Sequence, residues 1–257
     1  MRMDWSRAKS VLILAFLVLN VVLGYQLWQD VSERLNADQK LGDLGADTLR
    51  IMKERGIGLA SSASIPSETP KLRDLTYRFK TPPGSAERVE LKTPVDSRIV
   101  FDEKELQEQL GDVIPGLKLY RFDQLASTDG VFVLYRTAGG RPMFDVKLEL
   151  FYSNQNQKIT AYRQTQVELE ESDASEAREV LSASKAVMPL IDKYLEEGSV
   201  IKEISLGYHG QLFNSETQYA APSWRVMLEN GKPFYVHAIS AEVVQEKSDD
   251  EATSVHP

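Results

Sequence analysis

The sequence predicts an α+β protein in which one N-terminal transmembrane helix precedes two small subdomains, each a helix packed on an antiparallel sheet. Three observations lead to this class. An almost unbroken apolar run lies near the N-terminus, strand patterns dominate the rest, and a strand–glycine turn–strand pattern occurs twice. The predicted divisions are a cytoplasmic N-terminus (1–9), the transmembrane helix (10–29), a juxtamembrane stalk with the first extracytoplasmic subdomain (30–169), the second subdomain (170–246) and a disordered acidic tail (247–257).

Composition excludes several classes of function. The 257 residues are 42% hydrophobic and 26% charged, which is typical of a folded chain long enough for two small domains. The formal net charge of -8 argues against nucleic-acid binding, because that function needs clustered Lys and Arg. The chain contains no cysteine, so disulfides, thiolate metal sites and cysteine nucleophiles are all excluded.

The apolar run is interpreted as a membrane anchor. Residues 11–24 are apolar except for Asn20, and the flanking apolar residues extend the run to about 18, close to the ~20 that a helix needs to cross a bilayer. Basic residues before the run predict a cytoplasmic N-terminus and place the rest of the chain outside the cytoplasm. A cleaved signal peptide is the alternative, but it would end in small residues, whereas residues 24–29 are bulky and aromatic.

Individual residues of this segment have expected roles. Aromatic and basic side chains at its two ends are predicted membrane-interface anchors, namely Trp5, Arg7, Lys9, Tyr25 and Trp28. Asn20 has two interpretations. Its amide can hydrogen-bond to another transmembrane helix, or it can be a single tolerated polar residue in a very apolar span. Both interpretations stay open at this level.

The first subdomain is predicted to combine two short helices with strands. A helix over 46–56 begins near Asp47 and ends at Gly56, and an exposed loop follows over 58–70. A second helix lies within 101–112, because Asp102 and Glu105 have capping-box spacing. Strand patterns occupy 72–79, 87–92, 117–122, 130–137, 143–152 and 158–169, and the last two form a hairpin.

The second subdomain is predicted to begin with a longer helix over 173–198, kinked or divided by Pro189. Its apolar stripe is interpreted as core, with a partner-binding face as the alternative; the stripe consists of Val180, Leu181, Val187, Met188, Ile191, Tyr194 and Leu195. Strands follow over 200–210 and within 223–244. The similar segments 133–146 and 225–237 favour a duplicated helix-plus-sheet unit.

A search for chemistry predicts no catalytic residue, no cofactor and no metal site. The three histidines, His209, His237 and His256, lack a metal-ligand spacing, and no serine-nucleophile or phosphate-loop motif occurs. The glycines of "LGYHGQ" (206–211) are explained by a turn. The acidic run from Glu168 to Asp173 is interpreted as a solvated edge, although paired carboxylates could form a hydrolase site.

The chain resembles the YycH/YycI proteins of low-GC Gram-positive bacteria, and the YycI branch in particular. The resemblance rests on "MDWSRAKSVLILAFLVLNVVLGYQL" (3–27), "LRIMKERGIGL" (49–59) and "GGRPMFDVKLELFY" (139–152). The last hairpin, within 223–244, is similar to those of PepSY-like domains. The resemblance implies a single-pass, non-enzymatic protein of the cell membrane. Its implied partners are the WalK (YycG) sensor histidine kinase and a sister YycH-like protein, and its implied role is to adjust the kinase that controls cell-wall metabolism.

Two alternatives belong to other functional classes. One is a PepSY-like inhibitor or binding module for an envelope peptidase, which would act without its native anchor. The other is a membrane-tethered hydrolase of envelope polymers, which would need a cleft with convergent carboxylates or histidines.

Overall fold

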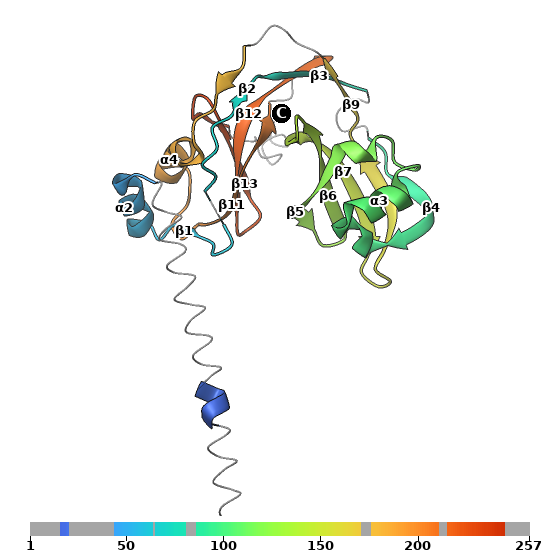
Figure 1. Ribbon diagram of the computed structural model, residues 1–257, viewed down its shortest axis with the longest axis horizontal. Helices are drawn as coiled ribbons and strands as arrows, with labels where there is room; N and C mark the ends of the chain where they lie inside the picture. The colour runs from blue at the N-terminus through green and yellow to red at the C-terminus, as the bar shows by residue number, and fades with distance from the viewer. Residues whose placement is uncertain are drawn as a thin grey trace, which may run out of the picture.

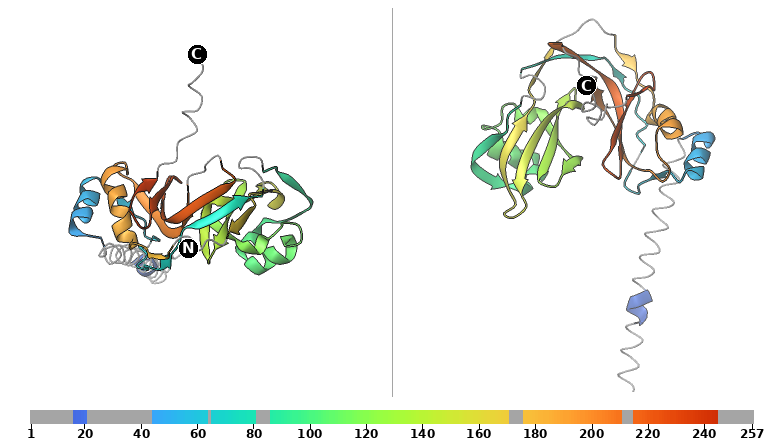
Figure 2. Two further views of the ribbon diagram at one scale, coloured as in Figure 1. Left: turned by 90° about the horizontal axis from the view of Figure 1, so that it is seen from above. Right: turned by 180° about the vertical axis from the view of Figure 1, so that it is seen from behind.

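The computed structural model describes residues 16–20, 44–63, 65–80, 86–170, 176–210 and 215–244. Within these residues the chain is an α+β protein in which strands predominate over helices (Figure 1). The α+β class predicted from the sequence is therefore confirmed for the described residues, whereas the two predicted subdomains do not have separate antiparallel sheets but share one sheet. Its two lobes can be followed from the front and from behind (Figures 1 and 2).

Besides the helical residues 16–20, the described part of the chain holds three helices and two 3-10 turns. The helices are α2 (Ala46–Glu54), α3 (Glu103–Leu110) and α4 (Ala183–Lys193), and the 3-10 turns are η1 (Ser97–Phe101) and η2 (Leu117–Leu119). The strands are β1 (Gly58–Leu59), β2 (Lys71–Leu72), β3 (Leu75–Phe79), β4 (Val89–Asp96), β5 (Tyr120–Thr128), β6 (Val131–Ala138), β7 (Arg141–Ser153), β8 (Lys158–Gln164), β9 (Val167–Glu170), β10 (Arg178–Glu179), β11 (Val200–His209), β12 (Thr217–Leu228), β13 (Pro233–His237) and β14 (Val243–Val244).

Twelve of the described strands belong to one branched sheet. Its main path runs in the order β14-β13-β12-β11-β7-β6-β5. Strand β8 joins the far half of β7 and carries β4, while β3 joins the start of β12 and carries β9. Strand β11 pairs in parallel with β1 and with β7, and β2 pairs with β10 outside this sheet.

The sheet is shared by two lobes. One lobe holds α2, α4 and β11–β14, and the other holds α3 and β4–β8; β3 and β9 lie across the top (Figure 1). The lobes join where β7 meets β11, through a single register pair between Met143 and Tyr208. The two halves of the sheet are thus one hydrogen-bonded unit with a sharp change of direction.

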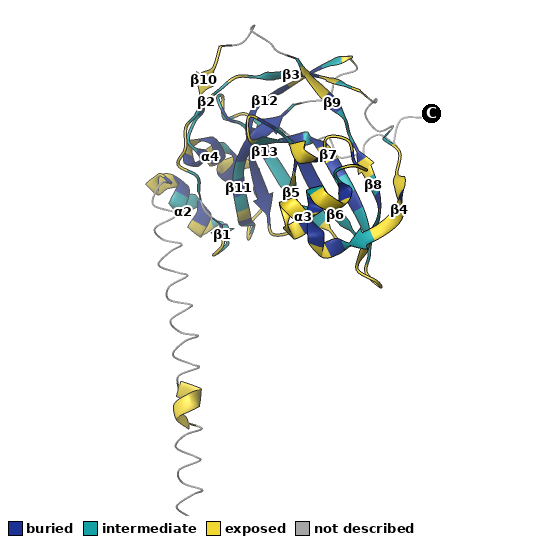
Figure 3. Cartoon of the chain, turned by 45° about the vertical axis from the view of Figure 1, so that its right-hand side comes forward, coloured by how far each residue is buried: buried dark blue, intermediate teal, exposed yellow. Residues whose placement is uncertain are grey.

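Alternation along the strands explains why each lobe is buried on both faces. In β12, Trp224, Val226 and Leu228 pack in the core beneath α4, whereas Arg225 points to the opposite face. In β6, Leu134 packs in the core beneath α3 while Val133 and Tyr135 point away from it. The second faces of the two half-sheets therefore meet each other, and Figure 3 shows buried residues concentrated on β7, β11 and β12.

Gly207 allows β7 and β11 to approach. A Cβ atom at this position would lie 2.5 Å from the carbonyl oxygen of Pro142 and 2.6 Å from Cε2 of Phe144. Gly207 lies inside β11, and its φ is not among the positive values of the described glycines. The interpretation of this glycine as a turn residue is therefore wrong, because it serves close packing of two strands.

Local signals predicted α3 and both hairpins correctly. Asp102 caps α3, since its Oδ1 accepts hydrogen bonds from the backbone N–H groups of Lys104 (2.9 Å) and Glu105 (3.1 Å). The segments 133–146 and 225–237 form the hairpins β6–β7 and β12–β13. For α2, the predicted end is confirmed by the positive φ of Gly56, but the N-cap residue is Gly45 and not Asp47.

The predicted helix over 173–198 is too long. Helix α4 begins at Ala183, because the residues before it form β10 and pair with β2. Pro189 lies within α4 and does not divide it. The stripe is mainly core, as expected, with Val180, Val187, Ile191 and Leu195 buried and Met188 and Tyr194 exposed.

The hydrophobic clusters divide the chain differently from the ranges 30–169 and 170–246. Leu44, Met52 and Ile57, from the part before the boundary, pack with α4, Trp224 and Val236. Helix α2 and strand β1 therefore belong to the lobe formed by the C-terminal part of the chain. Local sequence patterns do not report which distant segment shares a core.

The N-terminal segment is described only over residues 16–20, which are helical and exposed. Among the residues that the structure describes, no helix combines the length and apolarity needed to cross a membrane. The transmembrane helix over 10–29 therefore stays a prediction. Trp5, Arg7, Lys9, Tyr25, Trp28 and the tail 247–257 lie outside the described residues.

The substitution Gly207→Ala tests the junction of β7 and β11. We expect it to lower the free energy of unfolding by about 1–3 kcal/mol, because the added methyl overpacks the contact with Pro142 and Phe144. Urea denaturation of the purified full-length chain measures this. Gly58→Ala is the control, since its Cβ would be 3.8 Å from Val200 Cγ2 and should cost little. Equal stability of both variants would contradict the role of Gly207.

Candidate functional site

The two lobes meet at a cluster of charged and aromatic side chains, which we call the inter-lobe cluster. Its members come from six strands of the main sheet path and are linked by the contacts described below. They are Asp123 (β5), Tyr135 (β6), Phe144 and Asp145 (β7), Glu203 and His209 (β11), Arg225 (β12) and Tyr235 (β13). Two points within the cluster hold the charges: one around Arg225 and one around His209.

Arg225 is the most deeply buried charge of the cluster, with 2% of its side chain exposed. Its Nη2 lies 2.7 Å from Oδ2 of Asp123 and 2.7 Å from Oε1 of Glu203. Burial alone would lower the pKa of Arg225, but the two carboxylates outweigh it and raise the pKa above its ordinary value. The guanidinium therefore stays charged and bridges β12 to both β11 and β5.

Aromatic rings surround the same guanidinium. Its central carbon is 4.8 Å from the centroid of the Phe144 ring and 5.7 Å from that of Tyr135, so the cation lies within range of both. The two rings pack edge to face with their centroids 5.6 Å apart. Burial raises the pKa of Tyr135 to about 12, so its hydroxyl stays protonated.

Strand register explains why Arg225 and Glu203 are neighbours, and the folding back of the sheet explains how Asp123 reaches Arg225. Arg225 lies opposite Ser205, and Glu203 lies opposite Met227, so Arg225 and Glu203 are diagonal neighbours on one face. Asp123 is on β5, at the other end of the main path. Its contact with Arg225 requires that the second half of the sheet turn back toward the first.

His209 forms the second point. Its imidazole is 5% exposed and stacks on the ring of Tyr235 at a centroid distance of 3.8 Å. Nδ1 of His209 lies 2.7 Å from Oδ1 of Asp145, and the backbone N–H of Gly210 donates to Oδ2 of Asp145 at 2.8 Å. Asp145 thereby connects β7 to the end of β11.

This arrangement favours a structural role for the cluster. An Asp–His pair is a component of many catalytic sites, but this imidazole is enclosed by Tyr235 and leaves little surface for a substrate. The convergent carboxylates of Asp123 and Glu203 both bind Arg225. Within the described ranges, no group of three or more His, Asp and Glu side chains is placed to hold a metal ion.

The other candidate residues lie apart from the cluster. His237 ends β13, and its Nδ1 accepts hydrogen bonds from the backbone N–H groups of Ile239 (3.3 Å) and Ser240 (3.2 Å). Glu170 forms an ion pair with Arg78 at 2.8 Å, and Glu168 is exposed, as expected of a solvated edge. His256, Glu171 and Asp173 lie outside the described residues, and Asn20 is exposed on its short helical segment.

Sequence reasoning missed Asp123, Glu203 and Arg225 as partners. The only available signal was Arg225 itself, a charged residue between apolar neighbours in "SWRVML". A buried charge needs a partner, but Asp123 lies on β5 at the other end of the sheet path, and the contact with Glu203 depends on the register of β11 against β12.

Comparison with known proteins identifies the family. The model of the family described as "YycI protein" matches residues 47–239, which is more than half of the chain. The chain belongs to the YycI family. The resemblance inferred from the sequence is confirmed, and the matched region of this YycI-family chain runs from α2 into the loop after β13.

Other comparisons add little to the family assignment. No curated protein matches this YycI-family chain. Among solved structures, it is similar to an uncharacterized protein from Eubacterium rectale ATCC 33656, with 15% sequence identity and a TM-score of 0.34. That match covers 46% of this chain and 42% of the other, so this likeness carries no argument about fold or function.

Replacing Arg225 tests whether the inter-lobe cluster holds the lobes together. We expect Arg225→Met to lower the free energy of unfolding by about 3 kcal/mol, near the lower end for breaking a buried ion pair, because Glu203 keeps some solvent. Urea denaturation provides the measurement. In the control Arg121→Met, an exposed pair with Glu103 is lost, and the cost should stay below about 1 kcal/mol. Similar losses in both variants would refute the special role of Arg225.

His237 makes stability depend on pH. Burial lowers the pKa of His237 from its ordinary 6.5, so the unfolded chain binds a proton more readily than the folded one. Its stabilising effect is complete above pH 6.5 and declines as the pH falls toward the folded-state pKa. Denaturation at pH 7.5 and about 5.5 should show a smaller acid loss for His237→Asn, whose amide oxygen can still accept from the loop. An unchanged acid loss would disprove the assignment.

Proposed function

We propose that this chain is a non-enzymatic, membrane-anchored regulatory protein that adjusts a WalK/YycG-type sensor histidine kinase of cell-wall metabolism. The single observation that carries this proposal is the match of the YycI family model across residues 47–239. Family membership suggests a role in the YycG/WalK system, and the finer statements about anchor, partners and contacts are our proposal.

The exposed apolar side chains of residues 16–20 support the anchor. The side chains of Phe16, Leu17, Val18 and Leu19 are each more than half exposed. Because these four residues are consecutive, their side chains point to all sides of the helix. A helix that is apolar all round needs an apolar environment, such as lipid or another helix. In this proposal the helix spans the cell membrane once, with residues 1–9 in the cytoplasm and the two lobes outside.

Asn20 is the proposed contact with a partner helix. Its amide is the polar group in an apolar stretch, and such a group in a bilayer is stabilised by hydrogen bonding to a neighbouring helix. The proposed partners are the sensor kinase and a sister YycH-like protein. Through this contact, a movement of the anchor helix would shift the transmembrane helices of the kinase.

The inter-lobe cluster supports a non-enzymatic role for the folded part. A membrane-tethered hydrolase would need accessible carboxylates or an accessible histidine. Asp123 and Glu203 are held by Arg225, and His209 is enclosed. In this proposal these side chains stabilise the junction of the lobes and do not take part in catalysis.

Co-purification of the full-length chain with its kinase tests the helix contact. We expect Asn20→Leu to weaken the association about fivefold, which corresponds to the ~1 kcal/mol of an interhelical hydrogen bond in a membrane. The control is Val18→Leu, two positions away and thus on a different side of the helix. Kinase autophosphorylation in reconstituted membranes gives a second readout and should change only for Asn20→Leu.

Two results would count against this function. Unchanged association and signalling in Asn20→Leu would remove the helix-contact mechanism. Inhibition of an envelope peptidase by the full-length chain, with equal potency when its anchor is replaced by an unrelated transmembrane helix, would favour the PepSY-like inhibitor instead.

A further inference from the structure

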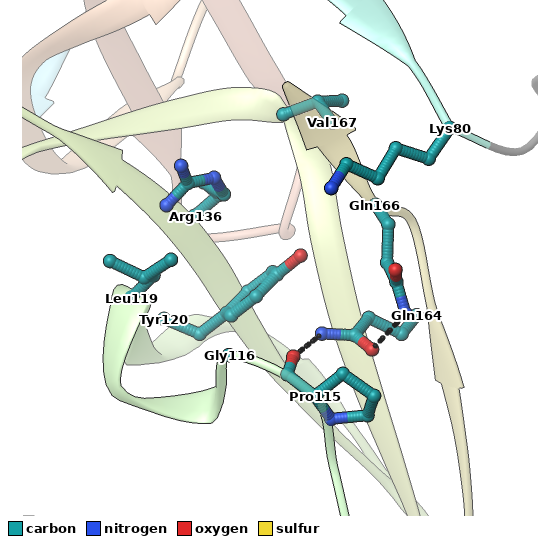
Figure 4. Close-up of a pocket in the computed structure, with 9 residues that line it drawn as sticks. All are labelled: Lys80, Pro115, Gly116, Leu119, Tyr120, Arg136, Gln164, Gln166 and Val167. Atoms are coloured by element: carbon teal, nitrogen blue, oxygen red, sulfur yellow. Dashed lines mark hydrogen bonds between the residues drawn. The ribbon is translucent and has the colours of Figure 1, made fainter. Parts of the chain in front are cut away.

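A cavity of about 150 Å³ lies where the start of β5 approaches the end of β3 and the β8–β9 connection. In Figure 4, Lys80 reaches toward the Tyr120 hydroxyl, and Arg136 lies on the other side of the space above the Tyr120 ring. Lys80 follows β3, and Arg136 belongs to β6, so the two cations come from separate parts of the chain. Gln164 and Gln166 form the wall nearest to Lys80 (Figure 4).

The cavity concentrates positive charge without a compensating carboxylate. None of the residues that line it is Asp or Glu. Within the described part of the chain, the Lys80 ammonium has no ion-pair partner, and the hydrogen bond of the Arg136 guanidinium is a long one of 3.5 Å to the Thr137 carbonyl. Two cations that face one cavity repel each other, so a bound anion would stabilise both.

Arg136 differs in this respect from most described arginines. In a chain with a net charge of -8, carboxylates are plentiful. Nine of the described arginines lie within 4.0 Å of one: Arg50, Arg78, Arg88, Arg98, Arg121, Arg141, Arg163, Arg178 and Arg225. Arg55 instead binds backbone carbonyls at the end of α4. Arg136 is half-buried yet keeps most of its donors free for a ligand.

Hydrogen bonds hold the walls of the cavity in place. Gln164 Nε2 donates to the carbonyl of Pro115 at 2.7 Å, and Gln166 Nε2 donates to Gln164 Oε1 at 3.0 Å. The Tyr120 hydroxyl donates to the carbonyl of Thr165 at 2.6 Å. Because these hydrogen bonds are made within the protein, the cavity is preorganised, and its charged donors are those of Lys80 and Arg136.

We propose that this cavity binds a small oxyanion of the phosphate type between Lys80 and Arg136. The planar guanidinium can donate two parallel hydrogen bonds to such a group, and the ammonium adds a second charge. Two cations favour a dianion over a monoanion. A volume of about 150 Å³ has room for one phosphate group.

Binding would also connect two parts of the fold. Lys80 follows β3, which pairs with β12 of the first lobe, whereas Arg136 lies in the sheet of the second lobe. The anion would therefore link the paired strands β3 and β9 to the lobe that carries α3. This role does not depend on the proposed kinase partner.

Isothermal titration calorimetry of the full-length chain in detergent, at constant ionic strength, tests the proposal with inorganic phosphate as the probe. We expect saturable binding of phosphate at pH 7.5 that is stronger than binding of acetate. Lys80→Gln and Arg136→Gln should each weaken it at least tenfold. Arg73→Gln is the matched control, because Arg73 is exposed and does not line the cavity, and it should bind phosphate like the unaltered chain.

The outcomes discriminate clearly. Absence of saturable binding, or equal affinity in Arg136→Gln and Arg73→Gln, would overturn the site. If Arg136→Gln does not fold, Lys80→Gln decides the question, because Lys80 is exposed beyond the end of β3. A titration with glycerol 3-phosphate separates two supporting cases: equal affinity indicates a phosphate attached to a larger molecule, and loss of affinity indicates the free ion.

Discussion

The ion pairs of Arg225 are the constraint on which the shape of this molecule depends. A guanidinium with 2% exposure is costly unless its charge is compensated, and its two carboxylates come from β5 and β11. Glu203 is a near neighbour in the register, but Asp123 approaches only because the sheet turns back at the β7–β11 junction. The rings of Phe144 and Tyr135 fill the space beside the cation, so charge and packing favour the same closed arrangement.

That arrangement has a second requirement, which is close approach of β7 and β11. The missing side chain of Gly207 admits Phe144, and Asp145 then reaches both His209 and the backbone of Gly210. The groups that look most like catalytic residues in the sequence are thereby used to join two lobes. The anion site proposed above lies elsewhere, at Lys80 and Arg136, where no Asp or Glu lines the cavity.

The proposed role, regulation through contacts, needs a stable folded part and a means of reaching a partner. Helices α2 and α4 pack on one half of the sheet and α3 on the other, so each lobe has its own core while the inter-lobe cluster fixes their relation. The apolar helical residues 16–19 lie apart from these cores. Family membership suggests a role for this chain in the YycG/WalK system. The predicted anchor is the segment proposed to contact the transmembrane helix of a partner.

The sequence by itself determined the local elements, the family and the fold class. Asp102 predicted the start of α3, and the two glycine turns predicted their hairpins, because caps and tight turns depend on residues a few positions apart. The start of α4 was missed because β10 pairs with the distant β2. The partners of Arg225, the purpose of Gly207 and the shared cavity of Lys80 and Arg136 were likewise decided only by the tertiary structure. Each depends on which strands pair or pack together in the fold, and that arrangement cannot be predicted from periodicity or composition.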